Sequence, residues 1–386
     1  MKMTTLSLIT AMAISTAFAG GDIAPAEPAA EMPQTVAETE EACNSNTTIN
    51  GKAVAYYYTD DSVDLFDEES SNLGTAVTVD VSHKLLEGIT ANFSAVGFTN
   101  LLDEYGYMEA EETGAFFNVA NITATFADTT LVAGRQLLDT PMVGGFDWLL
   151  APGSFEAYTL VNGSIPHVTL VGSYLAKWRP NNSGTDFIDL TDIDDGENYA
   201  FGAAYSNAFD ASIWYYNVDA GAAAGNPDKF TQIYADAGFK AGDVSLAAQY
   251  VTTDYDMADD SDAYGVKISA SVAGLDLMAA YNKVEDNTAG FVGRDGLYAS
   301  SWNTFAAASV GDNYKIEAAT ELNGLSATAS YAAYAYDNGT EEGHEIDVIL
   351  GYGVTDCFSL DAVYSNTDYG DGIDIAALEL VATYQF

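Results

Sequence analysis

A short block with a period of two recurs along this chain. Its last copy is LELVATY (Leu378 to Tyr384), and similar blocks upstream are VTLVGSY, FDASIWY, VSLAAQY, LDLMAAY, LSATASY and FSLDAVY. Alternate positions of each block are mostly apolar and end on tyrosine, which indicates a strand with one apolar face rather than a helix. Nearly every copy before the last follows a Gly, Asp, Asn or Pro turn signal. A chain that repeats such a strand and ends on an aromatic residue, Phe386, is predicted to be a membrane-spanning β-barrel.

Counting such segments predicts an all-β, transmembrane antiparallel β-barrel of about 18 strands over residues 46–386, and about 16 strands would also fit. The first candidate strand is 47–58 and the last is 373–386. Short turns alternate with long, often acidic connections, which are 59–74, 99–114, 138–153, 179–196 and 285–311. This asymmetry predicts long extracellular loops and short periplasmic turns. Region 285–311 could also hold a loop helix or an extra strand pair.

The amino-terminal residues 1–19 read as a secretory signal peptide. Lys2 gives the positive start, residues 6–14 are apolar, and Ala17-Phe18-Ala19 fits the small-x-small cleavage pattern. Residues 20–45 are rich in Pro, Ala and Glu, so we expect a flexible acidic periplasmic segment. Because no later apolar run is long enough for a membrane helix, strands must cross the membrane. The predicted location is the outer membrane, crossed many times.

The chain is strongly acidic, with 57 Asp and Glu against 12 Lys and Arg and a formal net charge of −45. Nucleic acid is therefore excluded as a partner, since phosphate binding needs a basic surface. The same carboxylates would attract cations into a water-filled lumen and repel anions. The charged strand residues opposite the apolar face, which we predict to point into the lumen, are Asp210, Asp276, Asp347, Asp361, Glu379, Lys177 and Lys315.

Other chemistry has weaker support in the sequence. Cys43 and Cys357 could form a disulfide or remain two separate thiols. Asp192, Asp194 and Glu197 resemble the start of a calcium loop but lack its remaining spacing, so bridging by Ca²⁺ and simple solvation both stay open. No other cofactor is expected. The three histidines are dispersed along the chain, and we therefore do not expect an enzyme.

A family resemblance lies in residues 133–178. Gly134-Arg135-Gln136, Asp139-Thr140-Pro141, the approach 149–152 and Phe155-Glu156 look like the third-loop region of the OprD-type porins. They are also similar to the major outer-membrane porins of epsilonproteobacteria. The resemblance implies an 18-stranded, trimeric passive-diffusion porin whose third loop folds inward, with small hydrophilic and often cationic or zwitterionic substrates. OprD-type channels carry a ladder of basic residues, whereas the only arginines here are Arg135, Arg179 and Arg294, which favours a general cation-preferring channel.

The third loop supplies the predicted pore constriction. Arg135, Asp139, Asp147 and Glu156 could set a transverse field across the narrowest point, or they could be solvated loop charges. The apolar Trp148, Leu149 and Leu150 favour a loop that faces inward or towards a subunit. The leading hypothesis is a homotrimeric, cation-selective porin among outer-membrane lipid and lipopolysaccharide. Two alternatives are a surface barrel that acts as adhesin or receptor through acidic loops, and a substrate-specific uptake channel.

Overall fold

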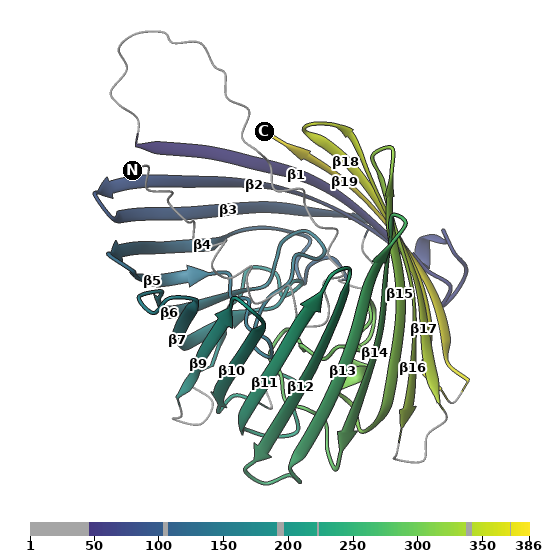
Figure 1. Cartoon of the computed structure of the whole chain (residues 1–386). Coiled ribbons are helices and arrows are strands. Elements are labelled where there is room, and N and C mark those ends of the chain that lie inside the picture. Colours follow the sequence, from purple (N-terminus) through teal and green to yellow (C-terminus); the bar gives the residue numbers. More distant parts are fainter. Residues whose placement is uncertain (1–45, 103–106, 191–196, 222–223, 337–341, 371) are drawn as a thin grey trace.

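A computed structural model describes residues 46–102, 107–190, 197–221, 224–336, 342–370 and 372–386. They form one antiparallel sheet in which neighbouring strands pair and β1 also pairs with β19, so the sheet closes into a barrel (Figure 1). The strands are β1 (Thr47–Asp60), β2 (Ser71–Leu86), β3 (Ile89–Leu102), β4 (Thr113–Phe126), β5 (Thr129–Gln136), β6 (Ser154–Asn162), β7 (Val168–Arg179), β8 (Ile188–Asp189), β9 (Asn198–Ser206), β10 (Asp210–Val218), β11 (Phe230–Ala241), β12 (Val244–Tyr255), β13 (Ser261–Val272), β14 (Leu275–Glu285), β15 (Gly311–Leu322), β16 (Leu325–Tyr336), β17 (Gly343–Thr355), β18 (Phe358–Asp368) and β19 (Asp374–Gln385).

One of these strands takes no part in closing the barrel. β8 has two residues and pairs only with the carboxyl-terminal end of β7, whereas β7 pairs directly with β9 along most of its length. Eighteen strands therefore make the wall, which confirms the predicted fold class and strand number. The described helical structure consists of two 3-10 turns, η1 (Glu68–Ser70) and η2 (Ala306–Ala308). Among the described residues, no helix has the length and apolar character that crossing a membrane requires.

The carboxyl-terminal residue closes the wall against the first strand. The amide of Phe386 donates to the carbonyl of Gly51 at 2.9 Å, and the Gly51 amide donates back at 2.8 Å. The Phe386 ring covers Gly51, where a Cβ would lie only 2.5 Å from its Cζ. The same Cβ would lie 2.7 Å from the Thr78 carbonyl oxygen, so glycine is needed for this close packing.

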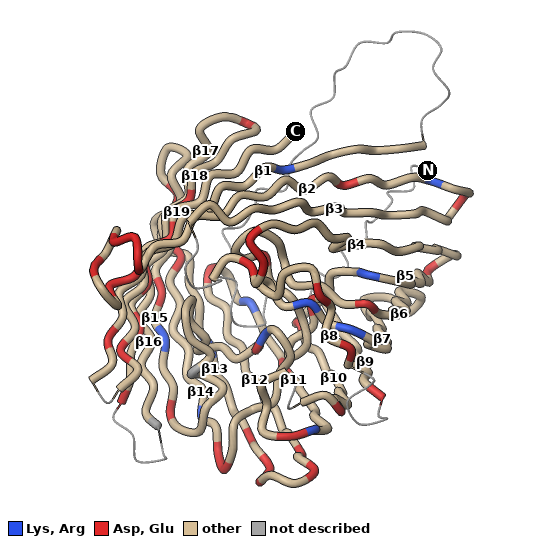
Figure 2. Tube along the Cα trace, turned by 180° about the vertical axis from the view of Figure 1, so that it is seen from behind, with Lys and Arg blue, Asp and Glu red and all other residues tan. Residues whose placement is uncertain are grey.

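The two faces of the wall differ as the period-two pattern predicts. Outward positions carry exposed apolar side chains such as Val266, Ile268 and Leu277, and rows of exposed tyrosines run across neighbouring strands. Tyr158 pairs with Tyr174, and Tyr250 pairs with Tyr264. Such tyrosines are typical of the boundary between lipid and headgroups. Asp and Glu residues outnumber Lys and Arg along the trace and are frequent in the connections (Figure 2).

The connections keep the predicted asymmetry. Short turns join β2 to β3, β4 to β5 and the corresponding later pairs, and long connections lie at the other end. Asn323 and Gly324, between β15 and β16, both have positive φ, at 52° and 81°. This is the conformation of a type I′ hairpin turn, for which Asn-Gly is the preferred pair. The local sequence therefore determines the turn.

Candidate functional site

Two connections lie inside the barrel and bind each other (Figure 1). We call residues 137–153 inner loop 1 and residues 286–310 inner loop 2. The Gly144 amide donates to the Val292 carbonyl at 3.0 Å, and the Val292 amide donates to the Met142 carbonyl at 2.9 Å. A Cβ at Gly296 would lie 2.5 Å from the Pro141 carbonyl oxygen, so only glycine allows this approach. The two loops consequently form one packed unit.

Inner loop 2 is held by polar side chains on the inward face of the wall. Gln249 donates to the Gly296 carbonyl at 3.1 Å and accepts from the Tyr298 amide at 2.9 Å. Asn282 accepts from the Ala299 amide at 2.7 Å, and Lys315 Nζ donates to the Ser300 carbonyl at 3.0 Å. Of the two alternatives for this region, the loop helix is present as the 3-10 turn η2, and the described residues form no extra strand pair. Wall side chains provide the hydrogen bonds that this irregular backbone needs.

Inner loop 1 is held mainly by apolar packing. Leu149 and Leu150 are buried against the inward faces of β1 to β4, in a cluster that includes Tyr56 and Phe98. At the other end of the loop, Met142 packs in a second cluster together with wall residues of β6 to β11. This placement agrees with the expectation that the apolar residues 148–150 favour an inward loop.

Glu379 on β19 joins the wall to both inner loops. Its Oε1 accepts from Trp302 Nε1 of inner loop 2 at 3.0 Å, and its Oε2 accepts from Trp148 Nε1 of inner loop 1 at 3.4 Å. Tyr56 on β1 donates a further hydrogen bond to Oε2. Glu379 is only 1% exposed. It was predicted as a lumen charge, and it does face inward, but the loops cover it.

Two ion pairs connect the inner loops to their surroundings. Lys52 on β1 binds Asp147 of inner loop 1 at 2.8 Å, and the Asp147 side chain is 50% exposed. Arg294 of inner loop 2 pairs with Asp139 of inner loop 1, and both side chains keep some exposure. These pairs place opposite charges side by side within the barrel. Lys52 is not among the predicted site residues, since its partner lies 95 residues away.

The structure corrects the prediction for Arg135 and Glu156. Arg135 pairs across the sheet with Glu156, with 3.6 Å between Nε and Oε2. Their positions share the face of the exposed Leu131, Tyr158 and Leu160, which point away from the lumen. The two charged residues therefore lie on the outer side of the wall, where Arg135 also stacks on Phe187 at 4.0 Å. Lys177 on β7 pairs with Glu156 on β6 and shares its outward side. The prediction that Lys177 points into the lumen is therefore also wrong.

The other predicted lumen charges fall on inward positions. Asp347 and Lys315 are buried there, and Asp347 accepts from Ser330 at 2.8 Å. Asp210, Asp276 and Asp361 alternate with the outward side chains of their strands and lie nearer the short turns. Lysines that the prediction omitted also face inward, namely Lys240 on β11 and Lys267 on β13. Lys267 Nζ lies 4.4 Å from the ring centre of Tyr298.

Two predictions lie wholly or partly outside the described residues. Cys43 is not described, so its pairing with Cys357 stays a prediction; Cys357 is exposed in the turn between β17 and β18. Asp192 and Asp194 of the weak metal site are not described either, and only Glu197 is. Within the described part of the chain, no group of three or more His, Cys, Asp or Glu could hold a metal ion. The signal peptide and the acidic segment also lie outside it.

A buried ion pair joins two long connections at the loop end of the barrel. Glu109, in the connection between β3 and β4, accepts from Arg179 Nη2 at 2.6 Å and from the Gly184 amide at 2.8 Å. The Arg179 guanidinium also stacks on Phe116, 3.7 Å from its ring centre. Burial raises the pKa of the Glu109 carboxyl to about 7, although Arg179 acts in the opposite direction. The contact is therefore sensitive to pH near neutrality.

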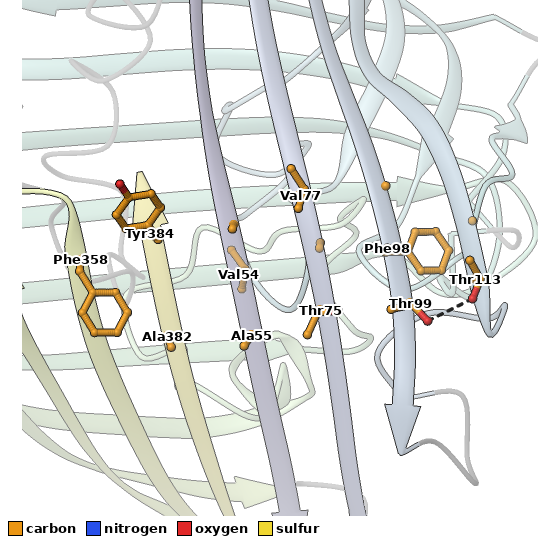
Figure 3. Close-up of a pocket in the computed structure, with 14 residues that line it drawn as sticks. Val54, Ala55, Thr75, Val77, Phe98, Thr99, Thr113, Phe358, Ala382 and Tyr384 are labelled. Atoms are coloured by element: carbon orange, nitrogen blue, oxygen red, sulfur yellow. Dashed lines mark hydrogen bonds between the residues drawn. The ribbon is translucent and has the colours of Figure 1, made fainter. Parts of the chain in front are cut away.

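A shallow groove of about 700 Å³ crosses β18, β19 and β1 to β4 (Figure 3). Small outward residues such as Ala55, Thr75 and Ala382 line it, and Thr99 and Thr113 are linked at 3.1 Å. Tyr384 and Phe358 lie at its edge (Figure 3). Because these positions face outward, the groove faces lipid and is separate from any path through the barrel.

The closed wall with its apolar exterior defines an integral membrane β-barrel. Its fold is that of the OprD-type, or Occ, porins. A structure of Pseudomonas aeruginosa OpdK with vanillate is 17% identical, with 88% of this chain and 98% of that chain covered and a TM-score of 0.75. P. aeruginosa OccK9 (OpdG) is 18% identical, with 88% and 98% covered and a TM-score of 0.74. Acinetobacter baumannii OccAB4 is 16% identical, with 89% and 98% covered and a TM-score of 0.72.

Comparisons of sequence add nothing to this fold relationship. No protein-family model matches the chain, and no curated protein matches it.

Proposed function

We propose that this protein is an outer-membrane porin that lets small hydrophilic solutes diffuse passively and prefers cations. The observation that carries the proposal is the pair of inner loops, which lie inside a closed barrel and place Asp147 and Asp139 on their exposed surface. Loops that fill part of a barrel of this size narrow it and so select by size and charge. The large excess of carboxylates favours cations. The homotrimer and contacts with lipopolysaccharide stay predictions.

The test is a recording in planar lipid bilayers with unequal potassium chloride solutions on the two sides. We expect stable conductance steps and a zero-current potential whose sign shows that potassium is more permeant than chloride. Protein that is folded as a barrel but conducts no ions would overturn the porin assignment. It would favour a surface barrel that binds partners through its loops.

A second candidate is a channel for small organic carboxylates. Its support is the inward row of Lys240, Lys267 and Lys315 on the alternate strands β11, β13 and β15, together with the similarity in fold to OpdK, whose structure holds vanillate. Lys315 is, however, buried against Ser300 and Glu317, which leaves less of its charge for a solute. The same recording separates the candidates, because the second predicts an anion-selective potential.

A further inference from the structure

The connection between β1 and β2 folds back over the outside of the wall. We call its residues 61–70 the outer loop, and Figures 1 and 2 both show it projecting beyond the barrel rather than into it. The Phe66 amide donates to Thr59 Oγ1 at 2.8 Å, and Ser71 Oγ donates to the same oxygen at 3.1 Å. Thr59 and Ser71 pair in the register and share the outward parity of Tyr57, yet both are buried. The outer loop therefore covers part of the outward face of β1 and β2.

The covered positions lie at the membrane boundary. Tyr364 is one of the repeated tyrosines that mark this boundary, and it pairs with Leu378, which in turn pairs with Thr59. One outward position further along β1, Tyr57 pairs with Leu380, an exposed residue of the lipid-facing side. Tyr57 and Leu380 also line a shallow groove of about 440 Å³ on that side. The outer loop thus begins where lipid already covers the wall.

The outer loop exposes large apolar side chains at this level. Phe66 is 63% exposed, and Val63 and Leu65 are exposed too. The Phe66 ring lies nearly parallel to the Tyr57 ring, with 6.5 Å between the ring centres, so it stands beside a lipid-facing residue. The backbone of Phe66 has a φ of 70°, which a bulky residue rarely adopts. Such strain persists where the surrounding structure enforces it, here through the bond to Thr59 that holds the ring outside the wall.

The charges of the outer loop bear on what covers its apolar side chains. Asp67 accepts from the Glu69 amide at 2.9 Å, and Asp61 accepts from the Ala376 amide at 2.8 Å, so these two carboxylates serve the folding of the loop itself. Glu68 and Glu69 are exposed. A second copy of this chain, with its net charge of −45, would bring further carboxylates against them. Lipid hydrocarbon brings no charge and is continuous with the lipid beside Tyr57, so it is the occupant that fits.

We propose that the outer loop is a membrane anchor, in which Phe66, assisted by Val63 and Leu65, inserts among the acyl chains at the boundary of the lipid leaflet on the loop side. The carboxylates of Glu68 and Glu69 stay in the water between the headgroups. Since Asp61 binds the Ala376 amide of β19, the anchor also holds lipid contact across the seam where β1 meets the last strand. This inference goes beyond the proposed porin function and does not depend on ion conduction.

The experiment measures contact between lipid and a tryptophan introduced into the outer loop. The full protein is folded into phosphatidylcholine vesicles with or without bromine near the headgroup end of the acyl chains, because bromine quenches tryptophan on contact. The native tryptophans lie in the inner loops or at inward positions of the wall, and they are Trp148, Trp178, Trp214 and Trp302. The native protein therefore gives the baseline that is subtracted from each variant.

Phe66→Trp keeps an aromatic ring at the proposed contact. We expect brominated lipid to quench its added fluorescence at least half as strongly as that of Ile268→Trp, which lies on the outward face of β13. Met257→Trp, in the largely exposed connection between β12 and β13, is the matched control and should show no quenching by lipid. Leu65→Trp leaves the contact of Phe66 with Tyr57 intact and carries the same test if Phe66→Trp does not fold.

Acrylamide, a neutral quencher dissolved in the water, reports the opposite environment. If it quenches the tryptophan introduced by Phe66→Trp as strongly as that of Met257→Trp, and brominated lipid does not, the outer loop lies in water and the inference is wrong. If neither quencher reaches this tryptophan, another protein chain covers it, and lipid is again the wrong occupant. Protein that shows the expected quenching but conducts no ions would refute the porin proposal and leave the anchor standing.

Discussion

Replacing Glu379 with alanine should loosen both inner loops at once. The change removes the acceptor for Trp302 at 3.0 Å, for Trp148 at 3.4 Å and for Tyr56. A hydrogen bond to a charged acceptor contributes about 2 kcal/mol, and the longer bond from Trp148 should contribute less, about 1 kcal/mol. Loss of both bonds made by the loops therefore lowers the free energy that holds them against the wall by about 3 kcal/mol. The population with displaced loops should rise by about a hundredfold.

Two measurements follow that population. Hydrogen exchange should become faster at backbone amides of both inner loops, including Asn303, whose amide is bound to Glu345. Single-channel recordings should show more frequent transitions to a higher conductance, since displaced loops leave a wider path. Glu379→Gln keeps one acceptor oxygen and should give a smaller effect, of about tenfold.

The matched control is Asp276→Asn, which removes one inward carboxylate beside the short turn between β13 and β14, where it accepts from Ser271 at 2.5 Å. This variant should change conductance slightly through charge but should leave loop exchange as it is. If Glu379→Ala also leaves exchange in both loops unchanged, Glu379 does not hold them, and the reasoning fails.

Three further changes test other parts of the structure. Burial raises the pKa of Glu109 from 4.5 to about 7, so the connections bind its proton more tightly when they are joined than when they are separated. Their contact should therefore be strongest below about pH 4.5 and weaken as the pH rises to about 7. Proteolysis of the loops at several pH values would show this dependence, and Glu109→Gln should abolish it. Gly296→Val should push inner loop 2 away from Pro141 and increase current noise, whereas Gly353→Val, at an open site on β17, should not. Arg294→Ala should alter ion selectivity, whereas Arg135→Ala should not, because Arg135 lies outside the lumen; equal effects of the two would contradict that placement.

The wall could be predicted from sequence because lipid imposes its pattern on every strand. An outward position at membrane depth must be apolar, so the alternation is visible locally and needs no knowledge of distant contacts. The last strand was predicted at 373–386, and β19 spans Asp374–Gln385. The first strand was predicted at 47–58 but runs on to Asp60, because beyond the lipid no such pattern marks where pairing ends.

The error at Arg135 came from setting the alternation aside. Arg135 was assigned to the pore constriction together with the third loop, although Leu131, Ala133 and Arg135 have the same parity and therefore share one face. Gln136, the next residue, is the inward one, and it donates to the Ala157 carbonyl at 2.9 Å. Counting parity to the end of β5 would have placed the guanidinium outside.

Inner loop 2 had no local signal of this kind, since what orders it lies elsewhere in the chain. Its backbone is bound by Gln249 and Asn282, which look like ordinary polar residues of inward strand positions when they are considered alone.

The burial of inward carboxylates changes how these charges should be understood. Glu379 and Asp347 are both about 1% exposed and are engaged by side chains around them. Buried in this way, they act mainly as anchors. In the proposed porin, the field that an ion meets would therefore be set by the more exposed ion pairs that involve the inner loops, Asp147 with Lys52 and Asp139 with Arg294.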